Sequence, residues 1–469
     1  MKPFRLFTFA VLAAAIVPRL AHRGMFVDGV TYASIARNLA EGRGSFWSPS
    51  YTATVYPQFH MHPALGLWLQ SLWFRALGDH MVVERAYAIT VALATAFLIG
   101  AIWRRLHEGN ENPSSARQFE WLPILSWIAV PVVSWSIVGN MLETTVTCFI
   151  AGSVAALVEA AWARPTAAFV AWGGLSGLCI IAAALTKGPV ALFALAAPLL
   201  VPVTSDRRGR SLLAAAQWTT AGICALGVLS VPEARASLLQ YLNEQLLPAL
   251  DGRYDSDSLK IVKVMLEGVW LPMIVGAVLI VAAARELVVP SKGEQRQAMS
   301  FLLLGLAGTL PILASRKQMG HYLVPAVPFF AMATASFIAP TVARLVGRIV
   351  VNRQAGAISA TAVFIIFGTI TASFVPALDR DRQRLADLDA LEPMAPRGVT
   401  VGICYAASGD WGLHAWFERR FHVSLDTALG SRRDWFLQTA PPAAGCPPAT
   451  CAPATDPSRQ LILLKCRRP

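Results

Sequence analysis

The sequence predicts an all-α protein that crosses a membrane many times and carries a small α/β domain at its C-terminal end. Hydrophobic residues make up 55% of the 469 residues and charged residues only 14%, whereas a soluble globular domain is about a quarter charged. Runs of about 20 apolar residues, long enough to cross a bilayer as a helix, recur along the chain. Transmembrane β-strands would instead be short segments of alternating polarity. The spans are therefore expected to be helical.

We expect about 11 to 13 membrane-spanning helices. The first apolar run follows Lys2 and Arg5, as the apolar part of a signal peptide would. Charged Arg19 and Arg23 come next without a small-residue cleavage site, which favours an uncleaved first span. The apolar stretches lie near residues 5–20, 83–103, 121–138, 143–162, 168–185, 189–203, 212–231, 265–284, 298–314, 322–339 and 356–376.

Basic residues in the short loops indicate the orientation, because Lys and Arg collect on the cytoplasmic side of a membrane. The opposite side then holds a first loop at 21–82, a linker at 232–264, several short turns and the tail. We therefore divide the chain into a membrane domain, 1–376, and a small outward domain, 377–469. The basic residues on the cytoplasmic side are Lys2, Arg5, Arg104, Arg105, Arg117, Arg207, Arg208, Arg210, Arg285, Lys292, Arg296, Arg344, Arg348 and Arg353.

The net charge and the cysteines agree with this topology. The charge of +12 comes partly from the cytoplasmic loops and their attraction to anionic lipid, and it does not indicate nucleic acid. An even number of cysteines in the tail is typical of an oxidising compartment, although three pairings are possible. In a bacterium this predicts a multi-pass inner (plasma) membrane protein with a periplasmic tail. The tail cysteines are Cys404, Cys446, Cys451 and Cys466.

The outward segments have their own secondary-structure patterns. From Asp28 to Gly42 apolar side chains recur at helical spacing, and Arg37 and Asn38 fall on the other face. This helix, and a second one from about Pro63 to Leu77, are expected to lie on the membrane surface. In the tail, the stretch DRDRQRLADLDALE predicts a solvated helix, and GVTVGICYA and QLILLKC predict strands. The tail therefore reads as a small α/β domain.

Polar groups placed among apolar spans are functional candidates, because burying them is costly. Asp28 sits just after the first span, and Glu143 lies at the turn between the third and fourth. Lys187 lies in the turn TKGP between the fifth and sixth spans. The turn between the ninth and tenth spans carries Arg316, Lys317, His321 and Tyr322. All four of these places are expected on the outer side of the membrane.

Structural roles are alternatives for several of these residues. Asp28 could be the N-cap of its helix, and Glu143 could be the partner of a helix dipole. Lys187 and Lys317 could extend to the interface as anchors. These roles do not exclude catalysis, and the gathering of all four residues at one membrane surface favours a functional site.

The residue types match the needs of one reaction. Inverting transfer of a sugar from a phosphate carrier needs a carboxylate to take a proton from the acceptor. It also needs cations to hold the departing phosphate, whose charge grows in the transition state. Since phosphate leaves as a stable anion, no general acid is needed, unlike in glycoside hydrolysis.

A metal site is less well supported by the sequence. His60 and His62 are two residues apart in a loop, which is a poor spacing for a closed metal site. We expect them to face substrate or to be structural. No cofactor is required with certainty. A divalent metal is compatible with the chemistry, and its candidate ligands are Asp28, Glu143 and His60.

At these positions the sequence resembles the integral-membrane GT-C glycosyltransferases, in particular the aminoarabinose transferases and the protein O-mannosyltransferase-like enzymes of family 39. DGVTYASIARNLAEG resembles the family's acidic first-loop motif, with Asp28 at the catalytic acid and Tyr32 at the usual aromatic. HPALGLWLQSLWFRALGDHMVVERAYAI resembles the second surface helix, with Arg85 at its basic position. NMLETTVTCF carries the second acid, Glu143, and LTKGPVAL carries Lys187.

The resemblance runs over about the first 340 residues and has departures. Gly29 stands where the family often has a second acid. Met61 and His62 stand where aminoarabinose transferases have a Glu-Lys pair, which weakens both metal binding and the assignment of that sugar. SRKQMGHYLVPAVPFF resembles the outer-turn motif that binds the carrier phosphate, and its residues are Arg316, Lys317, His321 and Tyr322.

The resemblance implies a GT-C fold and an inverting glycosyltransferase that uses a polyprenyl-phosphate-linked sugar. The acceptor would be lipid A or lipopolysaccharide, an envelope glycolipid or a protein. Glu143 would orient the acceptor or help hold a cation, and the 232–264 linker would close over the site. A lipid-linked-sugar transporter or flippase is the alternative. The implied site residues are Asp28 and Glu143 for catalysis; Lys187, Arg316, Lys317 and Arg85 for the donor phosphate; and Tyr32, His60, His62, His321 and Tyr322 for substrate.

Overall fold

The computed structural model describes most of the chain. Most of the expected span at 356–376, and residues 251–258 of the expected linker, lie outside the described residues. The described residues are 2–20, 22–108, 119–163, 166–201, 206–250, 259–348, 380–428, 433–440, 446, 448 and 450–467, with scattered positions between 354 and 369.

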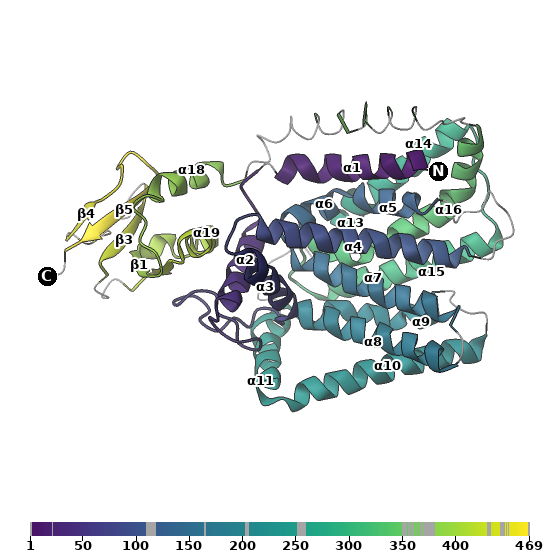
Figure 1. Ribbon diagram of the computed structural model, residues 1–469, viewed down its shortest axis with the longest axis horizontal. Coiled ribbons are helices and arrows are strands. Elements are labelled where there is room, and N and C mark those ends of the chain that lie inside the picture. The colour runs from purple at the N-terminus through teal and green to yellow at the C-terminus, as the bar shows by residue number, and fades with distance from the viewer. Residues whose placement is uncertain are drawn as a thin grey trace. The chain divides into compact units, whose positions relative to one another are not determined.

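The chain folds as two units (Figure 1). The first comprises Met1–Leu20, Met61–Gly66 and Arg85–Ser373. The second comprises Ala21–His60, Leu67–Glu84 and Phe374–Pro469. The first outer loop is therefore divided between them.

The first unit is helical, with α8 packed against both α7 and α10, and α15 packed against α16 (Figure 1). Its elements are α1 (Lys2–Leu20), α4 (Val83–Leu106), α5 (Trp121–Ile128), α6 (Pro131–Val138), α7 (Leu142–Ala160), α8 (Thr166–Lys187), η2 (Pro189–Ala196), α9 (Ala197–Leu200), α10 (Arg207–Ser230), α11 (Pro232–Tyr241), η3 (Leu242–Leu246), α12 (Leu247–Leu250), α13 (Lys260–Met265), η4 (Leu266–Trp270), α14 (Leu271–Ala284), α15 (Lys292–Thr309), η5 (Leu310–Ala314), η6 (Gly320–Ala326) and α16 (Val327–Arg348).

Seven helical stretches of the described residues are long and apolar enough to cross a membrane, and the bent pair α5 and α6 would make an eighth. This confirms the all-α polytopic fold. The expected spans at 5–20 and 189–203 correspond to α1 and to the shorter apolar stretch Pro189–Leu200, which are not among the seven. The seven are Val83–Leu106, Leu142–Ala160, Thr166–Lys187, Arg207–Ser230, Lys260–Ala284, Lys292–Ala314 and Gly320–Val346.

The break between α5 and α6 has a local cause. Pro131 is the first residue of α6. It has no N–H to donate, and it disfavours helical backbone in the residue before it. Val130 is accordingly extended, with φ −77° and ψ 116°, and the two helices meet at 75°.

Small residues allow the spans to pack closely. Two of them, Gly173 and Gly177, lie in α8. A Cβ atom on Gly177 would lie 2.5 Å from the carbonyl oxygen of Gln217 in α10. Beside this contact, the Ser153 and Ser176 hydroxyls are 2.7 Å apart, and the Gln217 side-chain amide donates to Ser176 at 2.8 Å. A buried polar group is tolerated between spans when it finds such a partner.

The second unit contains the small α/β domain expected for the tail. Its strands form one sheet in the order β2-β1-β3-β5-β4. The strand β1 pairs with β2 and β3 in parallel, whereas β5 pairs antiparallel with β3 and β4. The elements are α18 (Arg382–Leu391), β1 (Thr400–Ile403), η7 (Tyr405–Ala407), α19 (Trp411–Phe421), β2 (Ser424–Asp426), β3 (Trp435–Thr439), β4 (Cys451–Pro453) and β5 (Leu461–Cys466).

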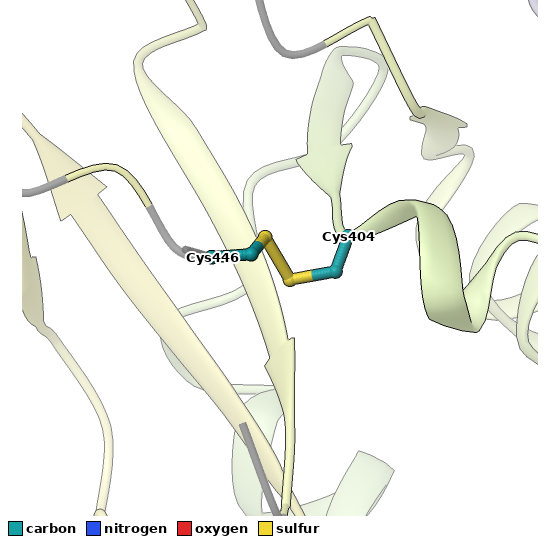
Figure 2. Close-up of a disulfide and its surroundings, with 2 residues drawn as sticks. All are labelled: Cys404 and Cys446. Atoms are coloured by element: carbon teal, nitrogen blue, oxygen red, sulfur yellow. A yellow bond between two sulfur atoms is a disulfide. The ribbon is translucent and has the colours of Figure 1, made fainter. Parts of the chain in front are cut away.

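Two disulfides close this domain. Cys404 at the end of β1 is bonded to Cys446, with Cα atoms 6.0 Å apart (Figure 2). Cys451 and Cys466 are bonded across the paired strands β4 and β5. The four tail cysteines therefore pair by sequence order, one of the three pairings that the sequence left open.

The helix α2 (Val27–Ala40) differs from the amphipathic surface helix that we expected, whereas α3 (Leu65–Leu77) has both buried and exposed residues. In α2 the whole stretch from Gly29 to Leu39 is buried. Arg37 and Asn38, expected on a solvated face, are each only 1% exposed. The expectation of a solvated face was wrong because Arg37 has a partner, Glu418, that lies 381 residues further along the chain.

Candidate active site

Glu143 lies in the first turn of α7, where the helix dipole favours a carboxylate. Asn140 has a positive φ of 51° and Met141 is extended, so α7 begins abruptly after α6. The Glu143 side chain is 1% exposed, and its Oε1 accepts a hydrogen bond from the Lys187 ammonium at 2.5 Å. Its Oε2 has no hydrogen-bond partner among the described residues.

Lys187 is the last residue of α8, the end at which a cation is favoured. The helix ends there because Gly188 has a φ of 81° and Pro189 follows. A Cβ atom at position 188 would lie 2.3 Å from the Tyr241 hydroxyl oxygen, so both the backbone conformation and the contact require glycine. That hydroxyl donates to the carbonyl oxygen of Lys187 at 3.5 Å.

The short helix η6, just before α16, completes a cluster around Glu143. His321 Nε2 is 3.5 Å from Glu143 Oε1, and the Trp135 ring stacks on the His321 ring with centroids 5.7 Å apart. The Lys187 ammonium lies 5.4 Å from the centre of the Tyr322 ring, within the range of a cation–π contact. Segments far apart in sequence thus converge on one ion pair.

Lys317 approaches the same region from the turn between η5 and η6. Its ammonium donates to Gln245 Oε1 at 3.4 Å, and Gln245 Nε2 contacts the Met61 sulfur at 3.0 Å. The Arg316 backbone N–H donates to the Ala249 carbonyl at 2.8 Å. The turn that carries both basic residues is therefore held against α12.

A cavity of about 270 Å³ lies between these segments. Its charged lining residues are two cations, Lys187 and Lys317, and one carboxylate, Glu143. Burial holds the pKa of His62 well below its ordinary value, and the charges of Lys187, Lys317 and His321 lower that pKa further. The lining is His62, Glu143, Lys187, Pro189, Val190, Tyr241, Gln245, Leu246, Ala249, Leu250, Ala307, Gly308, Pro311, Ile312, Ser315, Lys317 and Tyr322.

This lining has a clear chemical character. With His62 neutral, the ionised groups that line the cavity leave an excess of one positive charge. Most of the remaining wall is aliphatic, from α12, α15 and η5. A molecule with an anionic head and a hydrocarbon body would match both parts of the cavity.

Five of the residues expected at the site line this cavity: His62, Glu143, Lys187, Lys317 and Tyr322. His321 joins them through Glu143. Arg316 belongs to the same turn as Lys317 but is not among the lining residues.

Arg85 and three other expected residues lie elsewhere. The Arg85 guanidinium donates to the Leu20 carbonyl at 2.6 Å, which ties α4 to the end of α1. Asp28, Tyr32 and His60 belong to the second unit. Asp28 is half-buried at the second position of α2. The N-cap is Phe26 and not Asp28.

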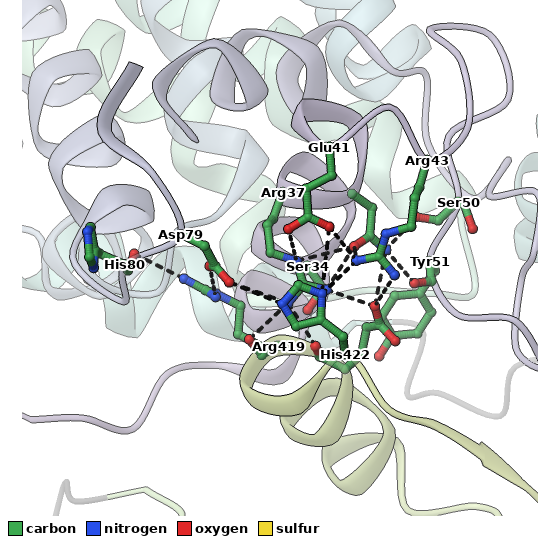
Figure 3. A network of polar contacts seen from close by, with 12 residues as sticks. Ser34, Arg37, Glu41, Arg43, Ser50, Tyr51, Asp79, His80, Arg419 and His422 are labelled. Atoms are coloured by element: carbon green, nitrogen blue, oxygen red, sulfur yellow. Dashed lines mark hydrogen bonds and ion pairs between the residues drawn. The ribbon is translucent and has the colours of Figure 1, made fainter. Parts of the chain in front are cut away.

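The possible metal ligands that cluster among the described residues do not include the candidates Asp28, Glu143 and His60. Among the described residues, the group of three possible metal ligands is Glu41, Asp79 and His422, all in the second unit. Guanidinium groups already neutralise it. Arg43 donates to Glu41 at 2.8 Å and lies 3.0 Å from His422 Nδ1. We therefore interpret the group as part of an ion-pair network (Figure 3).

Tyr241, Gln245 and Trp135 were not predicted from the sequence as site residues. Tyr241 and Gln245 belong to the linker that was expected to close over the site, so the segment was predicted but not its side chains. The glycine between Lys187 and Pro189 was the available signal for Tyr241, because a residue without a side chain allows another segment of the protein to approach closely. Trp135 lies in an apolar helix and had no distinguishing signal.

No protein family model matches the chain, and neither does any curated protein. Solved structures do match. ArnT from Cupriavidus metallidurans, in a crystal structure with bound undecaprenyl phosphate, is similar with a TM-score of 0.64 and 12% identity, over 98% of this chain and 97% of that chain. The apo state of the same protein gives a TM-score of 0.64 at 14% identity over the same shares. The apo oligosaccharyltransferase of Archaeoglobus fulgidus gives 0.55 at 11% identity, over 90% of this chain and 64% of that chain.

The chain has the GT-C glycosyltransferase fold. Within this GT-C fold, the Glu143–Lys187 pair and the cavity beside it are formed entirely by the first unit.

The buried Glu143–Lys187 ion pair predicts how substitutions at these two positions change the free energy of unfolding. Glu143→Met leaves a buried ammonium without its partner, which costs about 3–5 kcal/mol. Glu143→Met/Lys187→Met removes both charges and should recover most of that loss. Thermal unfolding of the protein in detergent measures this, with Glu267→Met, at an exposed glutamate of η4, as the control. A double variant no more stable than Glu143→Met would show that the two charges do not stabilise each other.

Proposed function

We propose that this protein is an inverting glycosyltransferase that takes a sugar from a polyprenyl phosphate carrier. The observation that carries the proposal is the cavity itself, which is lined by two lysines and otherwise mostly by apolar side chains. The fold supports the same reading, since ArnT, with the same fold, was crystallised with undecaprenyl phosphate. A phosphate on a long hydrocarbon chain has the two parts that such a cavity accommodates.

Lys187 and Lys317 hold the phosphate in this proposal. Their ammonium groups are compact point charges that form charge-assisted hydrogen bonds with phosphate oxygens. As the bond between sugar and phosphate breaks, negative charge grows on the phosphate, and fixed cations stabilise it more than they stabilise the ground state. Arg316 belongs to the same turn and adds to the positive field around the site.

Glu143 acts on Lys187 in this mechanism. The Glu143–Lys187 hydrogen bond fixes the ammonium at the end of α8, and the stacked His321 and Trp135 rings fix the carboxylate in turn. Glu143 is thus a positioning residue. It also offsets one of the two positive charges when the cavity is empty of phosphate, which lowers the cost of keeping both lysines ionised beside an apolar wall.

Asp28 is the proposed base. It takes a proton from the acceptor while the acceptor oxygen attacks the anomeric carbon from the face opposite the phosphate, so the carbon inverts in one displacement. Tyr32, one turn further along α2, faces substrate in this proposal. The acceptor is a lipopolysaccharide component, an envelope glycolipid or a secreted protein.

The reaction takes place on the periplasmic face of the inner membrane in this proposal. The two disulfides of the C-terminal domain support that location, because disulfides persist in oxidising compartments. The flippase alternative predicts charged residues in broken helices at mid-membrane. The buried pair described here lies at helix ends, with Glu143 at the start of α7 and Lys187 at the end of α8.

Undecaprenyl phosphate binding tests the phosphate site. Glu143→Met/Lys187→Met, which leaves no unpaired buried charge, and Lys317→Met each remove one charge-assisted hydrogen bond to the phosphate, worth about 1.5–3 kcal/mol. Each should therefore weaken binding about 10- to 150-fold, as measured by titration of undecaprenyl phosphate into the purified protein in detergent. Lys292→Met is the matched control, because Lys292 is exposed at the opposite end of α15 from the cavity. Equal affinities for the control and the two site variants would contradict the assignment.

The envelope composition of the host tests the reaction. In a strain lacking the gene, mass spectrometry of lipids and glycans should show the loss of one sugar-sized mass, which the wild-type gene restores. Asp28→Asn should restore less than about 1% of it, since general base catalysis contributes at least 100-fold. Asp456→Asn, at an exposed aspartate before β5, should restore it fully. Full restoration by Asp28→Asn would rule out the base, and an unchanged profile on deletion would rule out the transferase.

A further inference from the structure

The helix α19 of the C-terminal domain is bound to α2 next to Asp28. The Trp411 indole N–H donates to the Thr31 hydroxyl oxygen at 3.0 Å, and Thr31 lies three residues after Asp28 on α2. The Trp411 ring also stacks on the Tyr51 ring, with centroids 5.6 Å apart. The side chain of Trp411 therefore links the N-terminal half of α2 to the loop that follows α2.

A second link joins the other half of α2 to the C-terminal end of α19. The Arg37 guanidinium donates to Glu418 Oε1 at 2.8 Å, and both side chains are 1% exposed. The same guanidinium donates to the backbone carbonyls of Glu418 and Arg419, at 2.9 and 3.1 Å. Asn38 adds a hydrogen bond from its amide to Glu418 Oε1 at 3.3 Å. Figure 3 shows Arg37 and Arg419 within this network of polar contacts.

Apolar packing adds to these links at the start of α2. Val30, and Met25 just before the helix, are buried in the same core as Leu413 and Phe417 of α19. The beginning of α2 is thus held by the C-terminal domain through apolar contacts as well.

The charges of α19 reach a third segment of the second unit. Arg419 donates to Asp79 at 2.5 Å and to Glu84 at 3.1 Å. Burial raises the pKa of Asp79, but the hydrogen bond from His422 and the charges of Arg419 and Arg37 outweigh it and hold that pKa below its usual range. Because each buried guanidinium has a carboxylate partner, the network can be rigid, as a partly satisfied one cannot.

We propose that the C-terminal domain positions Asp28 for catalysis, with Trp411 and Glu418 as the positioning residues. The inference rests on the proposed function, in which Asp28 is the base, and it gives the domain a role in the transfer step. A displacement of about 1 Å at a reacting group can lower a rate about 100-fold. A helix whose N-terminal and C-terminal halves are both tied to α19 keeps that displacement small.

Trp411→Phe tests the inference, because it removes the hydrogen bond to Thr31 and keeps an aromatic ring to stack on Tyr51. Thr31→Val removes the same bond from the other side. Each should lower the amount of product in the complemented strain about tenfold. The double variant should be no worse than Thr31→Val, since the bond that Trp411→Phe removes is already missing in Thr31→Val. Trp435→Phe, at the half-buried tryptophan of β3 in the same domain, is the matched control and should leave the product unchanged.

Two further measurements separate positioning from loss of structure. Undecaprenyl phosphate affinity should be the same in wild type and Trp411→Phe, because the lysines of the cavity are untouched. Amide hydrogen exchange in peptides spanning residues 27–36 should be about tenfold faster in Trp411→Phe, the effect of one lost hydrogen bond. Exchange in peptides of α8 should stay unchanged.

The outcomes are distinguishable. Full product from Trp411→Phe and Thr31→Val would overturn the inference and leave the proposed function intact. Unchanged exchange in α2 would also overturn it, because α19 would then not hold α2. A wild-type protein that binds no undecaprenyl phosphate and restores no product would overturn the proposed function, and with it the catalytic purpose of the contact. Even then, faster amide exchange of α2 in Trp411→Phe than in the wild type would show that α19 holds this helix.

Discussion

The contact between Glu143 and Lys187 is the constraint on which the first unit depends. Each charge has lost most of its contact with water, so each needs the other. The start of α7 and the end of α8 must therefore meet, although 44 residues separate the two side chains. Both charged residues lie at helix ends, because Asn140, just before α7, and Gly188, just after α8, have a positive φ.

The same constraint produces the cavity. Because α8 stops at Lys187 and the chain turns at Gly188, the Tyr241 side chain can approach the backbone there and the linker can form one wall. The polar groups of the cavity are then held by helix ends, whose backbone dipoles favour them, and the aliphatic wall comes from side chains that packing between spans would bury in any case. A site for an amphipathic ligand thus needs few residues beyond those that form the fold.

Much of the fold could be predicted from the sequence, because burial in a membrane imposes long apolar runs that are visible locally. The expected spans at 83–103 and 143–162 correspond closely to α4 and α7. The gathering of Glu143, Lys187 and the turn at Lys317 was predicted too, since all three interrupt apolar stretches. Their individual partners were not predictable, because an ion pair depends on distance in space.

The second unit shows the same limit more strongly. The polar face of α2 indicated a surface helix, and only the fold reveals that Glu418 buries Arg37. The pairing of Cys404 with Cys446 likewise depends on where β1 ends. Asp28 could be singled out from its position after an apolar run. Its tie to Trp411 could not, because nothing in either local sequence refers to the other.

An experimental structure of the protein with undecaprenyl phosphate, determined by electron cryo-microscopy in a lipid nanodisc, tests the central claim most directly. The account predicts that the phosphate lies within hydrogen-bond distance, about 3 Å, of the ammonium groups of Lys187 and Lys317. Glu143 should remain bonded to Lys187, and the hydrocarbon chain should follow the aliphatic wall. A phosphate bound elsewhere, with the cavity filled only by water or membrane lipid, would contradict the account.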